Sequence, residues 1–312
     1  MTAKSVLVVK PSSLGDVVHT LPAVALLKKV LPDARLSWLV NPEWAPLLRE
    51  SPIVDETLIF PRHEFRGLGG AFKFARWLRT MKTFDLVLDF QGLLRSAIIG
   101  RACRGGELLG LSDAREGARF FYDRVVPVRR EHAVDRYLKL VASLGFALDA
   151  EPAFPLPAGE RTAGFPVDEP FVLLHPFARG AGKSLNGTAV AALCSGLQPV
   201  PVVLAGRTEE KPVAGCFDLL NRTSLLELIW LIRHASFVIS VDSGPMHIAA
   251  ALTDRLLAIH TWSDPRLVGP YNKNAWVWKD GVVFKQGDPG TSEPLAMSNI
   301  ARFVGRQLAG PE

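Results

Sequence analysis

An aspartate lies in a glycine-containing turn near the N-terminus, directly after an apolar run. Residues 5–10 (Ser-Val-Leu-Val-Val-Lys) are typical of a buried strand, and the turn-rich residues that follow end on Asp16. A carboxylate in such a turn could accept the proton of a substrate hydroxyl, provided that it reaches that hydroxyl. Capping the next helix is the commoner use of an aspartate in this position. Both interpretations of Asp16 therefore stay open.

A second turn of the same kind lies near the other end of the chain. Residues 237–241 are apolar, and Asp242, Ser243 and Gly244 follow before a helix-like run. The start of a helix presents backbone N–H groups and the positive end of the helix dipole, which favour an anion. Gly244 would let a phosphate approach the backbone, and His247 lies one helical turn beyond Ser243 on the same face. A plain helix cap and a packed histidine are the alternatives.

A third loop carries two cations. It follows the apolar run 171–175 and contains Arg179 and Lys183 among several glycines. Cations held in such a loop can stabilise a departing diphosphate by electrostatics alone. A solvated basic loop is the alternative.

Composition and charge narrow the function classes. The 312 residues suffice for two ordinary domains, and no apolar run reaches the length of a membrane span. The N-terminus shows no signal peptide, and three scattered cysteines suit a reducing compartment, so a cytoplasmic protein is expected. The first 150 residues carry 22 basic and 16 acidic side chains, against 14 and 15 in the remainder. This asymmetry indicates that the first half meets an anionic partner.

Apolar strands alternate with helical patterns in both halves, which predicts an α/β protein with two Rossmann-like, doubly wound parallel sheets. Strands are expected at 5–10, 36–40, 57–60, 86–90, 171–175, 200–205, 237–241 and 256–260, and the main helices at 17–30, 72–81, 187–197, 224–234, 246–252 and 298–308. Proline and glycine mark 151–168 as a linker. We expect domains at 1–155 and 156–297, with strand ends facing a central cleft, and a C-terminal helix at 298–312 that packs back on the first domain.

Several motifs together resemble glycosyltransferase family 9, the ADP-heptose–lipopolysaccharide heptosyltransferases. The resemblance rests on Ser12-x-x-Gly15-Asp16-x-x-His19-Thr20-Leu21-Pro22, on the segments 89–96, 132–137, 221–236 and 269–271, and on Asp242 to Leu252. It implies a GT-B fold and an inverting, metal-independent transfer of heptose from ADP-heptose to the inner core of lipopolysaccharide, without a cofactor. Asp16 matches the family's catalytic base. Lys183, Asp242, Ser243, Gly244 and His247 match its donor-binding residues.

Further contacts follow from the same resemblance. Arg179 joins the phosphate-binding set, and Glu209, Glu210 and Met246 are expected near the donor sugar or ribose. The acceptor side is expected to use Ser12, Ser13, Gly15, His19, Gln91, Arg95, Lys73 and Arg76. The last two lie in an amphipathic basic and aromatic stretch, residues 62–82, which either covers the core or flanks an anionic lipid-linked sugar. The expected partners are the nucleotide sugar, a lipid-linked core oligosaccharide and the cytoplasmic face of the inner membrane, with no metal and no nucleic acid.

The sequence also departs from the family pattern. Lys183-Ser184-Leu185-Asn186 stands where the family has Lys-(Arg/His)-Trp-Pro, and the segment from Gly206 to Asn221 is shorter than usual. A different donor sugar, an enzyme resembling nucleotide-sugar 2-epimerases, and a binding module without activity are therefore kept as alternatives. The intact Asp16 turn favours a transferase.

Overall fold

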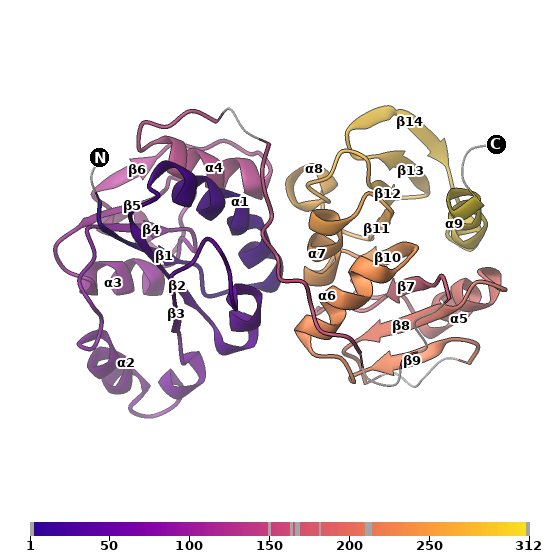
Figure 1. Ribbon diagram of the computed structural model, residues 1–312, viewed down its shortest axis with the longest axis horizontal. Coiled ribbons are helices and arrows are strands. Elements are labelled where there is room, and N and C mark those ends of the chain that lie inside the picture. The colour runs from indigo at the N-terminus through magenta and orange to yellow at the C-terminus, as the bar shows by residue number, and fades with distance from the viewer. Residues whose placement is uncertain are drawn as a thin grey trace. The chain divides into compact units, whose positions relative to one another are not determined.

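The computed structural model describes residues 3–148, 151–162, 165, 169–180, 182–209 and 214–309. The chain divides into two compact units, Met1–Pro157 and Ala158–Glu312 (Figure 1). The division lies two residues beyond the expected boundary at 155, within the expected linker. The α/β class is confirmed in each unit.

The first unit is built on a six-stranded parallel sheet with the order β3-β2-β1-β4-β5-β6. Its strands are β1 (Ser5–Val9), β2 (Arg35–Val40), β3 (Glu56–Ile59), β4 (Leu86–Asp89), β5 (Glu107–Leu111) and β6 (Arg124–Val126). Its helices are α1 (Leu14–Val30), α2 (Gly70–Leu78), α3 (Leu94–Ala102) and α4 (Ala133–Ala142), with 3₁₀ turns η1 (Pro42–Leu48), η2 (Arg62–Phe65) and η3 (Ala118–Phe121). The strand order reverses between β1 and β4, which is where open α/β sheets bind ligands.

The second unit has an eight-stranded sheet with the order β14-β13-β12-β11-β10-β7-β8-β9. Its strands are β7 (Val172–His175), β8 (Val202–Gly206), β9 (Phe217–Leu220), β10 (Phe237–Val241), β11 (Leu256–His260), β12 (Trp276–Lys279), β13 (Val282–Lys285) and β14 (Asp288–Pro294). Its helices are α5 (Gly187–Gly196), α6 (Leu225–His234), α7 (Gly244–Leu252), α8 (Pro265–Val268) and α9 (Ile300–Ala309), with one 3₁₀ turn, η4 (Met297–Asn299).

The last two strands add an antiparallel edge to the predicted parallel sheet. β12 pairs in parallel with β11, but β12–β13 and β13–β14 are antiparallel. The turn between β12 and β13 is Asp280-Gly281, with φ angles of 51° and 82°. Two residues with positive φ are what a tight hairpin turn requires, and Asp-Gly is a preferred pair for it. Strand β14 is mostly exposed along its length and carries a proline near each end.

The C-terminal helix packs into the core of the second unit. Ile300, Phe303 and Val304 of α9 are buried in the core of the second unit, against side chains of α5. The contact is close, because a Cβ built on Gly196 of α5 would lie 2.7 Å from the Cβ of Ala301. The buried face of α9 is therefore used by the second unit, and the expected contact with the first unit stays a prediction.

Strand burial explains why both sheets form where the apolar runs predict them. Val6, Leu7, Val8 and Val9 of β1 have no exposed surface, and every residue of β10 is buried. Strands covered on both faces carry continuous apolar runs, as parallel sheets require. In the described part of the chain, no helix combines the length and apolar character needed to span a lipid bilayer.

Candidate active site

Asp16 occupies the first turn of α1, at the carboxyl end of β1. The helix begins after Ser13, and Asp16 is its third residue. Its Oδ2 accepts hydrogen bonds from the Ser13 backbone N–H at 3.0 Å and from the Ser13 hydroxyl at 2.7 Å. A side chain that returns to the N-cap in this way stabilises the helix start. The capping interpretation of Asp16 is thus confirmed for one of its two oxygens.

The other oxygen of Asp16 faces a buried cation and a phenol. Oδ1 lies 3.7 Å from Lys10 Nζ, and the Tyr137 hydroxyl donates to it at 3.4 Å. The Asp16 side chain is nevertheless 40% exposed, whereas that of Lys10 is only 3% exposed. The carboxylate is therefore held at both oxygens and still open to a molecule from outside. This arrangement suits a general base as well as a cap.

Lys10 is the residue that fixes this arrangement, and the sequence did not single it out. Its ammonium donates to the Phe90 carbonyl at 2.9 Å and to the Tyr137 hydroxyl at 2.8 Å. Burial alone would lower the pKa of Lys10, but Tyr137, Asp16 and Asp89 together raise it above its ordinary value. A buried ammonium costs free energy unless it is paired and hydrogen-bonded. Lys10 meets that condition and stays charged next to Asp16.

The loop after β4 lies beside Asp16 because β1 and β4 are neighbours in the sheet. Gln91 in this loop accepts a hydrogen bond from the Ser12 N–H at 3.3 Å, and its own N–H donates to Asp89 at 2.9 Å. Asp89 is 1% exposed and also accepts from the hydroxyls of Ser96 and Tyr122. Burial raises the pKa of Asp89, although these hydrogen bonds oppose the rise. Asp89 therefore shapes the loop, and Gln91 faces the Asp16 turn.

The other residues predicted for the acceptor side differ in exposure and in position. Gly15 and His19 are buried, and the His19 ring packs edge-on against His132 with centroids 5.1 Å apart. His19 is only 4% exposed and therefore has little surface to offer a ligand. Arg95, Lys73 and Arg76 are exposed, the first on α3 and the others on α2. The structure thus brings Ser12, Ser13 and Gln91 to Asp16 and leaves the basic side chains of α2 on a separate surface.

The surface around α2 combines exposed apolar side chains with cations. Phe74 and Trp77 pack against the core of the first unit, as the helical spacing predicted. Leu68 and Phe72, by contrast, are 105% and 72% exposed. The exposed cations that surround them in sequence are Arg62, Arg66, Lys73, Arg76 and Arg79. We call Leu68, Phe72 and these five cations the α2 surface.

In the second unit, the Asp242 turn leads directly into α7. Ser243 takes the N-cap position, but its side chain does not cap the helix, and its Oγ lies 3.4 Å from the Ser240 hydroxyl. Asp242 and Gly244 are half-buried. The Met246 and His247 N–H groups donate to the Ser243 carbonyl at 3.1 and 3.4 Å, and Pro245 has no N–H. The anion-binding interpretation of this helix start stays a prediction.

Two residues on α7 are less accessible than expected. Met246 is fully buried and His247 is 7% exposed. Met246 therefore has no exposed surface in this unit, and its expected contact with the donor stays a prediction. Glu209 lies exposed in the loop after β8. Glu210 lies outside the described residues.

The loop that carries Lys183 follows β7, and the Asp242 turn follows β10. These strands are adjacent and parallel, with β11 on the other side of β10, so the loops after all three meet at one edge of the sheet. Arg179 is exposed and Lys183 is half-buried. The Lys183 ammonium lies 4.2 Å from the centre of the Trp262 ring, in the loop after β11. Cations and a helix start therefore share the carboxyl edge of this sheet.

Buried histidines lie at the ends of two of these strands. His175 ends β7 and His260 ends β11, and both are less than a tenth exposed. Burial lowers the pKa of each to about 4. The His260 Nδ1 lies 2.8 Å from the Ser263 hydroxyl. Both rings are consequently neutral near pH 7 and add no positive charge to the edge.

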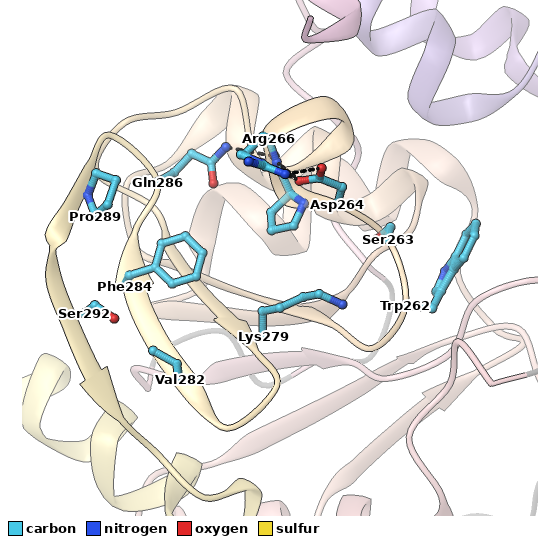
Figure 2. A pocket seen from close by; sticks show the side chains of 11 residues that line it. Trp262, Ser263, Asp264, Arg266, Lys279, Val282, Phe284, Gln286, Pro289 and Ser292 are labelled. Atoms are coloured by element: carbon cyan, nitrogen blue, oxygen red, sulfur yellow. Dashed lines mark hydrogen bonds and ion pairs between the residues drawn. The ribbon is translucent and has the colours of Figure 1, made fainter. Parts of the chain in front are cut away.

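A pocket of about 560 Å³ lies beside this edge, between the loop after β11 and the β12–β14 strands. Figure 2 shows Trp262 at one end of it, far from Pro289 and Ser292, with the Asp264–Arg266 ion pair above and Lys279 below. The sequence did not predict the pocket, because part of its lining comes from β12, β13 and β14, which the pattern of alternating strands and helices did not indicate. Among the described residues, no three His, Cys, Asp or Glu side chains gather as a metal site would require.

Comparison with known proteins identifies the family. The model of glycosyltransferase family 9 (heptosyltransferase) matches residues 71–281. Lipopolysaccharide heptosyltransferase 1 of Escherichia coli is 30% identical over 297 residues, covering 87% of this chain and 90% of that protein. The Salmonella typhimurium enzyme of the same name is 30% identical over 296 residues, covering 86% and 92%.

A solved structure agrees over nearly the whole length. The E. coli heptosyltransferase WaaC with ADP is 25% identical, with a TM-score of 0.77, and covers 96% of this chain and 98% of its own. The predicted GT-B class of two Rossmann-like units is confirmed by this match, apart from the antiparallel strands of the second sheet. Together with the family match over 71–281, it shows that this chain belongs to glycosyltransferase family 9, the heptosyltransferases.

Proposed function

We propose that this enzyme transfers heptose from ADP-heptose to the inner core of lipopolysaccharide, with inversion at the anomeric carbon and without a metal ion. The observation that carries the proposal is the Asp16 carboxylate, which is fixed by Ser13, Lys10 and Tyr137 and yet remains 40% exposed at the switch point of the first sheet. The family membership and the relatives named for lipopolysaccharide support the substrate class.

In the proposed reaction, Asp16 accepts the proton of the acceptor hydroxyl. The oxygen then forms its bond to the anomeric carbon while the bond to the diphosphate breaks, and ADP leaves with the electron pair. A single displacement of this kind inverts the configuration. A base held in this way has a fixed direction, because Ser13 donates to Oδ2 while Tyr137 donates to Oδ1 and Lys10 lies 3.7 Å from it. The substrate hydroxyl would approach the exposed part of the carboxylate.

The second unit would hold the donor. The start of α7, with Ser243 and Gly244, suits a diphosphate oxygen, and Lys183 and Arg179 would offset the charge that develops on the leaving group. The solved structure of E. coli WaaC contains ADP, which supports ADP as the nucleotide part of the donor. Glu209 is an exposed candidate for a contact with the donor sugar or ribose.

The α2 surface would meet the lipid-linked acceptor and the cytoplasmic face of the inner membrane. Leu68 and Phe72 could insert between headgroups, and the five cations around them would attract anionic lipids and phosphorylated sugars. Apolar insertion and electrostatic attraction together would bind a membrane more tightly than either alone, since stable peripheral binding usually needs two such contributions.

Two measurements test the proposal. A thermal-shift series with ADP, UDP, GDP and their sugars should show preferential stabilisation by ADP or ADP-heptose, whereas a preference for UDP would redirect the assignment toward an epimerase. Release of ADP from ADP-heptose should require lipopolysaccharide that lacks heptose and should persist in a chelator. Release that stops on chelation would contradict the metal-free mechanism, and absence of transfer would contradict the function.

A further inference from the structure

Trp262 lies against the cation that is expected to bind the donor diphosphate. The Lys183 ammonium is 4.2 Å from the centre of the indole ring. That distance is within the range of a cation–π interaction, for which Trp is the most favourable ring. Trp262 is 60% exposed, a large exposed area for an indole in a folded domain.

The loop that carries Lys183 is held by hydrogen bonds at two places. The Thr261 hydroxyl, next to Trp262, donates to the Gly182 carbonyl at 2.9 Å. At the base of the loop, the Ser184 hydroxyl accepts from the Ala178 N–H at 3.0 Å and lies 3.2 Å from the Ala178 carbonyl. The loop after β11 thus holds the loop after β7, and the two loops come from strands that flank β10.

The stem of Lys183 is confined as well as its ammonium. A Cβ built on Gly180 would lie 3.6 Å from both Cδ and Cε of Lys183, so the backbone of Gly180 packs beside the aliphatic stem. Gly180 has a φ of 107°, a conformation that residues with a side chain rarely adopt. Lys183 therefore lies between the Gly180 backbone and the Trp262 ring.

We propose that Trp262 is a positioning residue for the donor diphosphate, because it holds the Lys183 ammonium at the carboxyl edge of the second sheet before the nucleotide binds. A free lysine side chain loses rotamer freedom when it binds a ligand, and a lysine already held loses less. The ring covers one side of the ammonium and leaves its other N–H groups for phosphate oxygens. The proposal rests on the proposed function and assigns a role to a residue outside the motifs that identify the family.

Affinity for ADP measures this role directly. Trp262→Leu removes the π system, and we expect the dissociation constant for ADP to rise about 2- to 5-fold, as an exposed cation–π contact implies. Trp262→Tyr and Trp262→Phe should give smaller rises, because they retain a ring. The Michaelis constant for ADP-heptose should follow the same order. A role in packing alone would not follow the strength of the cation–π interaction.

A double-mutant cycle with Lys183→Met separates this contact from others made by Trp262. In the Lys183→Met background, Trp262→Leu should change ADP affinity by less than its effect in the native background. Phe284→Leu is the matched control, because Phe284 also lines the 560 Å³ pocket but makes no described contact with Lys183. It should leave ADP affinity within twofold of the native protein.

A second readout needs no nucleotide. When the lysines are dimethylated with ¹³C-formaldehyde, the methyl resonance of Lys183 should be shifted upfield by the Trp262 ring current and should return to the position of exposed lysines in Trp262→Leu. Equal ADP affinity in the native protein and Trp262→Leu, or no upfield resonance, would overturn the proposal while leaving the transferase intact. A native protein that binds UDP but not ADP would instead overturn the proposed function.

Discussion

Replacing Asp16 by asparagine separates its two roles. The asparagine Oδ1 can still accept the bonds from the Ser13 N–H and hydroxyl, so the start of α1 should survive. The amide can no longer take up a proton. We therefore expect Asp16→Asn to remove the base while retaining most of the cap, unlike Asp16→Ala, which removes both.

The two effects differ in size. Loss of a general base typically lowers turnover by 10²- to 10⁴-fold, or about 3–5 kcal/mol in the activation barrier. The stability effect is smaller, because Lys10 keeps its bonds to Phe90 and Tyr137 and loses only a carboxylate at 3.7 Å that is 40% exposed. Such a solvent-screened pair contributes about 1 kcal/mol. Activity should consequently fall far more than the free energy of unfolding.

The assay is steady-state ADP release with ADP-heptose and heptose-deficient lipopolysaccharide, accompanied by ADP affinity and thermal unfolding. ADP affinity should stay within about twofold, since Asp16 lies in the first unit and the proposed donor contacts lie in the second. Asp55→Asn is the matched control: Asp55 accepts from the Leu36 N–H at 2.7 Å and from Lys28 at 3.0 Å, outside the Asp16 turn. It should lower stability and leave turnover unchanged. Turnover of Asp16→Asn within threefold of native would refute the base assignment.

Three further predictions follow from other parts of the structure. Burial lowers the folded-state pKa of His175 and His260 to about 4, below the ordinary 6.5. On acidification the unfolded chain therefore binds these protons before the folded protein does. The free energy of unfolding should fall as pH drops from about 6.5 to 4, by about 3 kcal/mol for each histidine. Thermal midpoints at stepwise pH should show the fall, and His260→Gln should reduce it; an identical pH dependence in that variant would contradict the reasoning. Gly110→Ala should cost about 1–3 kcal/mol in urea unfolding, because its Cβ would lie 2.1 Å from the Tyr122 ring, and native-like stability would show that the ring yields freely. The double variant Leu68→Ser, Phe72→Ser should float less with anionic vesicles than the native protein and keep its ADP affinity. Ile59→Ser changes an exposed apolar residue outside the α2 surface and should float like the native protein. Equal flotation of the native protein and both variants would argue against membrane insertion.

The sequence predicted those elements whose own residues carry the signal. The ends of strands 237–241 and 256–260 were predicted correctly. A strand buried on both faces of a parallel sheet is an uninterrupted apolar run, so the polar residues on either side mark where it ends. The hairpin of β12 and β13 was missed, although Asp280-Gly281 between two aromatic and β-branched segments is a recognisable hairpin signal.

The candidate site was predictable only where chemistry is local. Asp16 and the Asp242 turn lie in short motifs that can be read directly. Lys10 and Tyr137 are 127 residues apart and meet only because α4 packs against α1, so no local pattern indicates their hydrogen bond. The same holds for Lys183 and Trp262, which are brought together by two loops at one sheet edge. The burial of Met246 could not be predicted, because the place of a residue in a motif does not give its exposure.

Strand β14 forms an edge of the second sheet that is poorly suited to pairing with a strand of another chain. An ordinary edge strand offers a row of N–H and C=O groups on which another chain can add itself, and this is a common start of aggregation. Proline has no N–H to offer, and β14 carries Pro289 and Pro294 together with the charges of Asp288 and Glu293. The antiparallel strands β13 and β14 therefore also cover β12, the last parallel strand, against pairing with another chain, which would help to keep the enzyme dispersed at the concentrations found in a cell.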